Sequence, residues 1–408
     1  MKQHTISIIA LSMLVATNAN AGAYMFPELG MMSNSTAGAG AGAQAIAEGA
    51  ETAFANPAAM SEFDTPVMAF NIQGMVSSID YTDSGSTGVF AGGDDQTAAG
   101  TSMPVGSFYY IQPINDKWTA GVALASSGGS LIDYGPDYAG ALLLQDAQLL
   151  TVQLNPSVSY KVNEQLSFGV GLVSELGVLE QNLAGSTDGI IPKIEVTGDS
   201  LDFGYTLSSF YKIDANNQIG FTYRSEIDHE LDGEVTALGA SNDSSINVVM
   251  PAMALLSGHH QLTADTAMMW SLGWTDFSKI AETPVTLTNA SGGIARDWKD
   301  TVSASVGVHY QLNSKWRLES GVYYETSPQD DPTYQYPDVP TGEIWKLGMG
   351  ASYELNSQWR LQMYYEYLYA GQSSIEYTLL EGSPLESTLQ GDYDIDLHFF
   401  GLLMNYRF

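Results

Sequence analysis

Hydrophobic and polar residues alternate one for one along most of the chain after Asp64. Between residues 201 and 211 the large apolar side chains fall on one face and small or polar ones on the other, and residues 150–161 repeat this pattern. Such a period of two is typical of β-strands, because successive side chains point to opposite faces. Segments of about ten such residues can cross a bilayer as tilted strands. The inner face of a soluble β-sandwich has the same alternation, so further evidence is needed.

Two kinds of connection separate these segments, and they follow one another in strict alternation. The short ones carry Asn, Asp or Pro turn signals, at residues 113–116, 162–164, 214–217, 259–264, 312–314 and 355–357. The long ones are polar and lie near residues 83–101, 127–149, 182–197, 237–244, 280–297, 328–341 and 371–391. Outer-membrane barrels have short periplasmic turns and long extracellular loops. The pattern therefore predicts an all-β, antiparallel transmembrane barrel of about 14 strands, with both chain ends on the periplasmic side.

Aromatic side chains gather near the ends of the predicted strands. Trp316 and Trp359 lie in two hairpins of nearly the same sequence, YQLNSKWRL at 310–318 and YELNSQWRL at 353–361. Indole and phenol rings favour the headgroup level, so we expect aromatic girdles in contact with outer-membrane lipid. The chain ends in Phe408 after alternating hydrophobic residues, which is similar to the signal by which barrel-assembly machinery recognises outer-membrane proteins.

The stretch from Gly22 to Asp64 lacks this alternation and is rich in Ala and Gly. Its sharpest motif is Asn56-Pro57-Ala58, in which the proline fixes φ and removes a hydrogen-bond donor. Small side chains allow close backbone packing in a confined space, so we expect residues 22–64 to form a plug inside the barrel of residues 65–408. The alternative is a flexible N-terminal tail.

The first 21 residues have the pattern of a secretory signal peptide. Lys2 supplies the positive charge, residues 6–16 the apolar core, and Ala19-Asn20-Ala21 a cleavage site. We therefore expect export with cleavage near Ala21. No later stretch has the roughly 20 apolar residues of a spanning helix, and the chain has no cysteines for disulfides or thiolate metal sites.

The formal net charge of −32 excludes binding to nucleic acid by phosphate neutralisation. In a membrane barrel this charge can be spread over loops and lumen, away from the apolar outer belt.

Several blocks of sequence resemble, in the same order, those of the FadL-type outer-membrane transporters of long-chain fatty acids and aromatic hydrocarbons. These blocks are FANPAAMSEF (54–63), LNPSVSYKVNEQLSFGVGL (154–172), GFTYRSEIDHELDGE (220–234), LGWTDFSKI (272–280), DWKDTVSASVGVHY (297–310) and GVYYETSPQDDPTYQYPDVP (321–340). The resemblance covers nearly the whole mature chain and implies a 14-stranded barrel with an N-terminal hatch that contains Asn56, Pro57 and Ala58.

The resemblance also implies a transport mechanism. Outer loops capture a hydrophobic substrate, which moves to a site touched by the mature N-terminus, here Tyr24, Met25 and Phe26. A hatch shift then releases it sideways through a gap at a kink in the third strand. By order that strand is Lys117 to Ser127, and Gly121 or the pair Gly128 and Gly129 could supply the irregularity.

Two cations are candidates for binding a substrate carboxylate. Parity places Arg224 inward, on the same side as Glu226 and Asp228 and opposite Ile227, and it also places Lys299 inward between outward Trp298 and Asp300. Charge-assisted contacts to carboxylates are strong in a dry site. The alternative is ion pairing with neighbouring lumen acids.

The cationic site that the family has in its fifth strand is missing, because residues 173–179 offer Glu175 but no Arg or Lys. This departure puts recognition of a fatty-acid carboxylate in doubt and leaves room for a neutral hydrophobic substrate.

The long connection at residues 138–150 contains Leu142, Leu143 and Leu144. By topology it forms an exposed apolar patch, which we interpret as the capture surface. The alternative is a loop that folds inward and buries its own leucines.

The predicted function is therefore passive uptake of hydrophobic compounds, with long-chain fatty acids first and aromatic hydrocarbons as the alternative. A general porin is disfavoured by the plug. An outer-membrane hydrolase is disfavoured because the histidines show no Ser-His-acid spacing. We expect no catalytic residue, cofactor or metal, and the sequence gives no reason for a state other than monomer.

Overall fold

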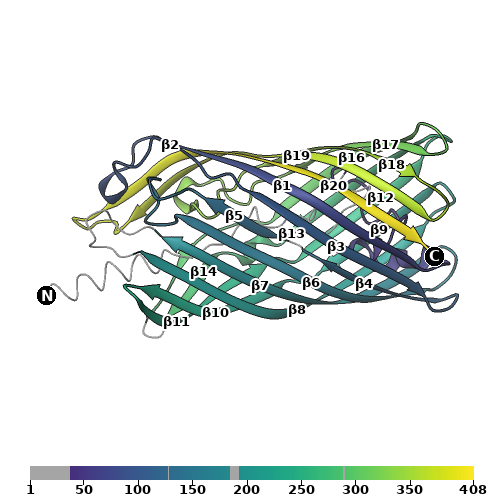
Figure 1. Cartoon of the computed structure of the whole chain (residues 1–408), viewed down its shortest axis with the longest axis horizontal. Helices are drawn as coiled ribbons and strands as arrows, with labels where there is room; N and C mark the ends of the chain where they lie inside the picture. The colour runs from purple at the N-terminus through teal and green to yellow at the C-terminus, as the bar shows by residue number, and fades with distance from the viewer. Residues whose placement is uncertain (1–36, 127, 184–192, 288–289) are drawn as a thin grey trace.

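A computed structural model of the chain describes residues 37–126, 128–183, 193–287 and 290–408. They form one long, closed barrel of tilted antiparallel strands, with a short segment of chain inside it (Figure 1). The first strand, β1, pairs with the last, β20, along its whole length from Val67↔Arg407 to Asp83↔Gly391, and this pairing closes the barrel.

The strands are β1 (Val67–Asp83), β2 (Gln96–Ala98), β3 (Ser102–Pro113), β4 (Trp118–Ala125), β5 (Gly129–Asp133), β6 (Asp146–Lys161), β7 (Leu166–Leu183), β8 (Ile194–Lys212), β9 (Asn217–Arg224), β10 (Ile227–Ala237), β11 (Ala240–Met250), β12 (Met253–Gln261), β13 (Thr266–Thr275), β14 (Glu282–Leu287), β15 (Ala290–Ala295), β16 (Thr301–Gln311), β17 (Trp316–Glu325), β18 (Ile344–Glu354), β19 (Trp359–Leu379) and β20 (Ser387–Arg407). The helical turns are α3 (Thr52–Ala55), η3 (Pro57–Glu62), η4 (Gly88–Phe90), η5 (Phe277–Lys279) and η6 (Pro332–Tyr334).

These twenty segments make fourteen barrel strands, which confirms the predicted fold. Six barrel strands are interrupted and therefore count as two segments each, namely β2 with β3, β4 with β5, β9 with β10, β11 with β12, β13 with β14, and β15 with β16. No helix among the described residues is long and apolar enough to cross a membrane.

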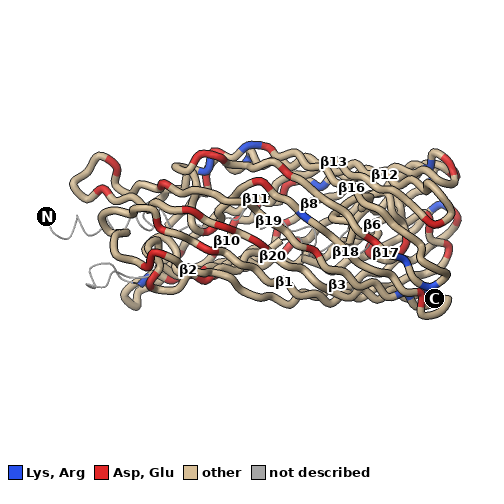
Figure 2. The backbone as a smooth tube through the Cα atoms, turned by 90° about the horizontal axis from the view of Figure 1, so that it is seen from above, with Lys and Arg blue, Asp and Glu red and all other residues tan. Residues whose placement is uncertain are grey.

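The outer face of the barrel is apolar where the alternation is cleanest. On β8 the side chains of Leu201 and Phe203 are 59% and 62% exposed, whereas the inward Ser208 is buried. Large apolar side chains exposed in this way around a closed sheet form the lipid-facing belt of a membrane barrel. β3 carries no Asp or Glu and β1 carries them only near its end, at Asp80 and Asp83, whereas acidic residues are frequent along β10 (Figure 2).

Rings from neighbouring strands pack together next to the short turns. Trp316 lies 4.6 Å from Tyr353 and Trp359 lies 4.8 Å from Tyr406, measured between ring centroids. The two hairpins of similar sequence fold alike, because Asn313 Oδ1 accepts hydrogen bonds from the backbone N–H groups of residues 315 and 316, and Asn356 Oδ1 accepts them from residues 358 and 359. A repeated turn thus sets the same register on two adjacent hairpins.

Candidate functional site

Residues 37–63, here called the plug segment, lie inside the barrel among inward-facing side chains. Barrel glycines let its backbone come close to the wall. A Cβ on Gly220 would lie 1.7 Å from the carbonyl oxygen of Gln44, and a Cβ on Gly321 would lie 2.0 Å from that of Gly38. Any larger side chain at these two wall positions would therefore displace the plug segment.

Asn56 joins two parts of the plug segment to the wall, and its side chain is fully buried. Its Oδ1 accepts a hydrogen bond from the N–H of Ala58 (3.0 Å) and so caps η3, in which Pro57 occupies the first turn. Its Nδ2 donates to the carbonyl oxygens of Gln44 (2.7 Å) and Ser209 (3.1 Å). One amide thus joins a helical turn, the turn of the plug segment at Gln44 and β8.

Arg224 points inward as parity predicts, but its partner is the plug segment. Its Nη2 donates to the carbonyl oxygen of Phe54, and its guanidinium lies 4.0 Å from the centre of the Phe54 ring. The prediction that Glu226 and Asp228 share its side is wrong, because both are exposed and Ile227 is buried. The strand is interrupted between Arg224 and Ile227, and an extra residue there reverses the parity of everything that follows.

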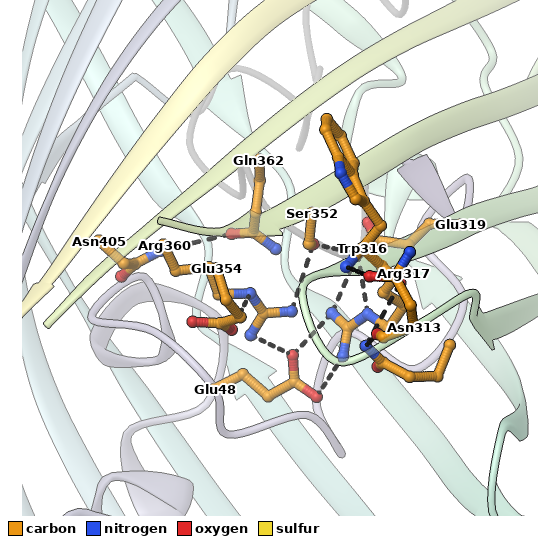
Figure 3. Close-up of polar contacts among 11 residues, drawn as sticks. Glu48, Asn313, Trp316, Arg317, Glu319, Ser352, Glu354, Arg360, Gln362 and Asn405 are labelled. Carbon is orange, nitrogen blue, oxygen red and sulfur yellow. Dashed lines mark hydrogen bonds and ion pairs between the residues drawn. The ribbon is translucent and has the colours of Figure 1, made fainter. Parts of the chain in front are cut away.

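An ion-pair cluster also holds the plug segment, at the end of the barrel that carries the short turns (Figure 3). The carboxylate of Glu48 lies between two arginines of the wall. It accepts hydrogen bonds from Arg317 (2.8 and 2.7 Å) and from Arg360 (2.6 Å). Arg317 also pairs with Glu319 at 3.0 Å, and Arg360 lies 3.5 Å from Glu354.

Burial alone would raise the pKa of Glu48, but the charges of Arg317 and Arg360 outweigh it and hold this pKa well below the usual range. Glu48 is therefore an anion at neutral pH, and we call this group the Glu48 clamp. The sequence analysis missed it. The available signal was the repeated hairpin, which places Arg317 and Arg360 at equivalent positions four residues after turn asparagines.

A mainly apolar pocket lies in the outer half of the lumen, with about 760 Å³ of empty space that is partly open to solvent. Its apolar lining includes Met253, Leu255, Phe277, Ile344 and Leu368. Among its lining residues is also Lys346, which is 6% exposed and lies with Nζ 4.5 Å from the centre of the Tyr323 ring. We call this space the lysine pocket.

A smaller pocket of about 400 Å³ lies next to β5 and is almost wholly apolar. It is lined by residues of β1, β5 and β20, among them Met75, Leu131 and Leu397. Pro340 contributes to both pockets, so the loop that contains η6 separates them.

The smaller pocket adjoins an interruption of the third barrel strand. β4 ends at Ala125 opposite Gln153, and β5 begins at Gly129 opposite Leu150, a register shift of one residue. On its other side β4 pairs with β3 only as far as Phe108↔Leu124, so in the described structure residues 102–107 of β3 lack a strand partner on this side. Of the two glycines predicted to cause it, Gly128 lies in the interruption and Gly129 is the first paired residue after it.

Gly121 lies elsewhere, in the regular part of β4, paired with Ile111 and Ser157. A Cβ at this position would lie 2.3 Å from the sulfur of Met60. Its position gives space to the plug segment and does not interrupt the strand.

The predicted inward orientation of Lys299 is wrong. Lys299 is exposed, and the neighbouring Trp298 is 4% exposed. Asp297 has a φ of 46°, a left-handed conformation that turns the chain over at the start of the strand and reverses the expected faces. The buried cation here is Arg296, whose Nη1 and Nη2 both bond to the carboxylate of Asp338.

The prediction that Leu142, Leu143 and Leu144 form an exposed patch is also wrong. Leu143 and Leu144 are 1% and 2% exposed and belong to the apolar core of the outer half of the barrel, and Leu142 is half-buried against that core. The loop folds inward because burial of its leucines is more favourable than their exposure to water. The candidate residues Tyr24, Met25 and Phe26 and the predicted signal peptide lie outside the described residues.

Comparisons with known proteins agree with this geometry. A family model described as outer membrane protein transport protein (OMPP1/FadL/TodX) matches residues 12–408. A long-chain fatty acid transport protein of Escherichia coli O6:H1 is 26% identical over 370 residues, which are 79% of this chain and 82% of that protein.

Two solved structures have the same fold. A FadL homologue of Pseudomonas aeruginosa aligns with a TM-score of 0.84 at 20% identity, over 94% of this chain and 99% of that one. The toluene transporter TodX of Pseudomonas putida aligns with a TM-score of 0.70 at 14% identity, over 95% and 99%.

Proposed function

Because the chain belongs to the outer membrane protein transport family (OMPP1/FadL/TodX), we propose that it takes up long-chain fatty acids across the outer membrane of a Gram-negative bacterium by passive diffusion. The family assigns the outer-membrane location and the transport of hydrophobic compounds. The choice of fatty acids rests on the relative in Escherichia coli and on the chemistry of the lumen.

The observation that carries the proposal is the sequence of apolar spaces inside the barrel. The lysine pocket is mainly apolar, which suits a hydrocarbon chain, and Lys346 in its lining is our candidate for binding a carboxylate. Arg224 binds the plug segment through Phe54 and so belongs to the contacts that hold the hatch. From the lysine pocket a hydrocarbon passes Pro340 into the smaller pocket beside β5.

Release is sideways, through the interruption between β3 and β5. A hydrocarbon that leaves the smaller pocket there enters the lipid directly and avoids water. The plug segment, together with the rest of residues 22–64, acts as the hatch, and its movement requires that the Glu48 clamp and the bonds of Asn56 break. Phe408, 57% exposed at the end of β20, is available to the barrel-assembly machinery.

Neutral aromatic hydrocarbons are the second candidate substrate. The observation in favour is that the fifth barrel strand, β7, carries Glu175 and no basic residue within 173–179, and that both pockets are mainly apolar. TodX shares the fold but supports no substrate assignment by itself.

The test is uptake of labelled oleate by cells that lack their own outer-membrane transporter. Production of this protein restores oleate uptake, and Asn56→Ala removes most of the gain while the barrel still assembles. Uptake of labelled toluene but not of oleate would replace fatty acids by neutral hydrocarbons as the substrate.

A further inference from the structure

A second interruption of the barrel wall lies between β8 and its neighbour. β8 pairs with β9 as far as Thr206↔Arg224, and pairing resumes with β10 at Asp199↔Asp232. Six residues of β8, 200–205, therefore face seven residues, 225–231, without ladder pairing. At one end of this stretch Ser225 bonds to Tyr205 in both directions: its N–H donates to the carbonyl of Tyr205 at 2.9 Å, and its Oγ accepts from the N–H of Tyr205 at 2.9 Å. We call it the β8–β10 seam.

The seam lies at the same height as the interruption next to β5. β4 runs for eight residues from its short turn before it breaks, and β9 also runs for eight residues from its short turn. Equal lengths of strand give equal distances along the wall, so both interruptions fall at the same level of the membrane.

Three side chains of β10 close the seam in place of backbone bonds. Ile227 packs on Gly204, where a Cβ would lie 2.8 Å from its Cγ1, and Leu231 packs beside Gly198. Between them, His229 bridges the seam through Nδ1, which lies 2.8 Å from Ser200 Oγ. All three are at most 5% exposed.

His229 also contacts carboxylates of two other strands on the lumen side of the wall. Its Nδ1 lies 3.1 Å from Asp202 Oδ2 on β8, and its Nε2 lies 2.8 Å from Glu175 Oε1 on β7. The imidazole therefore links β10 to β8 and β7 by side-chain contacts.

The two faces of the seam differ in chemistry. Behind it, Ile227 and Leu231 belong to the same apolar core as Met75 and Leu397, which line the smaller pocket. In front of it, β8 presents the lipid-exposed Leu201 and Phe203, whereas β10 presents a row of exposed carboxylates at Glu226, Asp228 and Glu230.

We propose that the β8–β10 seam is a second lateral opening of the barrel, through which neutral hydrophobic molecules reach the membrane when the side chain of His229 swings aside. The opening needs no ladder of backbone bonds to break, because residues 200–205 of β8 have no ladder pairing on this side in the described structure. Carboxylates on the β10 side repel an anionic head group, so fatty-acid anions leave by the opening between β3 and β5. This inference rests on the proposed function, since hydrophobic cargo must first enter the lumen.

The test uses the absence of cysteine from the chain. Gly204→Cys combined with Ile227→Cys places two thiols across the seam, where the side chains are in contact. The matched control is Leu207→Cys combined with Tyr223→Cys, a directly opposed pair on the regularly paired part of the same strands. His229→Ala provides a second, independent variant that removes the side-chain contacts of His229 with Ser200, Asp202 and Glu175.

Cells without their own transporter receive labelled hexadecane or labelled hexadecanoate, and label is counted in the inner-membrane fraction. Oxidation of the seam pair is expected to lower hexadecane transfer at least twofold relative to the reduced form and to leave hexadecanoate unchanged, with no effect in the control pair. His229→Ala is expected to raise hexadecane transfer at least twofold.

Equal hexadecane transfer by the oxidised and reduced seam pair, together with wild-type transfer by His229→Ala, would overturn the second opening. Failure of the proposed function has a different signature, because the unmodified protein would then transfer neither compound.

Discussion

Glu48→Ala is predicted to release the plug segment while the barrel stays folded. The substitution removes three charge-assisted hydrogen bonds; Arg317 keeps its contact with Glu319, and Arg360 keeps its contacts with Glu354 and Ser352. Removing one partner of a buried ion pair costs about 3–5 kcal/mol. The side chains of the clamp keep 13–29% exposure, so the lower end of this range, about 3 kcal/mol, applies.

At about 1.4 kcal/mol for each factor of ten, this loss shifts the balance from closed toward displaced plug by about a hundredfold. The shift can be measured in an Ala47→Cys background, because this half-buried plug residue is then the sole thiol of the chain. Maleimide labelling of Cys at this position is expected to accelerate by about the same factor, since it reports the displaced state.

The matched control is Glu354→Gln, which changes a carboxylate near the same Arg360 but outside the plug segment. Its pairing is long and half-exposed, so labelling is expected to stay at the parental rate. If Glu48→Ala also labels at that rate, the clamp does not hold the plug segment and the reasoning fails.

Three further predictions concern other groups of the pathway. Asn56→Ala is expected to reduce oleate uptake severalfold with normal amounts of heat-modifiable barrel on a gel, because it loses the bonds that join η3 to β8; normal uptake would remove this motif from the gate. Lys346→Met is expected to weaken hexadecanoate binding about tenfold and to leave hexadecane binding unchanged in titrations of the purified protein, and equal loss for both would exclude a carboxylate contact. Glu51 is 4% exposed, and burial raises its pKa to about 7 from an ordinary value of 4.5. A carboxyl whose pKa is higher in the closed state stabilises that state while protonated, below pH 4.5, and this contribution is lost as the pH rises through about 7. Labelling of Ala47→Cys should therefore increase between pH 5 and 8, after correction for the reactivity of the thiol itself, and Glu51→Gln should abolish the increase; an unchanged pH profile in Glu51→Gln would contradict this assignment.

The architecture could be predicted from the sequence because every strand of a membrane barrel must satisfy the same constraints. Each spanning segment must show apolar side chains to lipid and small or polar ones to the lumen, and short and long connections must alternate. These rules are local, so strand number and closure followed from the pattern, and the computed structure confirms them.

The inward or outward orientation of individual residues was harder to predict, because one extra residue in a strand reverses the facing of all residues after it. Because of the extra residue between β9 and β10, Ile227 faces inward, whereas Glu226 and Asp228 face outward. The left-handed conformation of Asp297 likewise turns Lys299 outward. The buried leucines of residues 142–144 depend on contacts with distant strands, which no local pattern contains. The same limit hid the Glu48 clamp, whose members are about 270 and 310 residues apart along the chain.

The twin hairpins have a consequence for how the chain tolerates insertions. Turn asparagines Asn313 and Asn356 fix the register of the strands that start at Trp316 and Trp359, and so they decide that Arg317 and Arg360 face the lumen. One residue added to either turn would rotate its arginine toward lipid and leave the plug carboxylate with a single counter-ion. The ion pairs of Glu48 inside the barrel therefore constrain the length of these two turns. We expect loops to vary in length at the opposite rim.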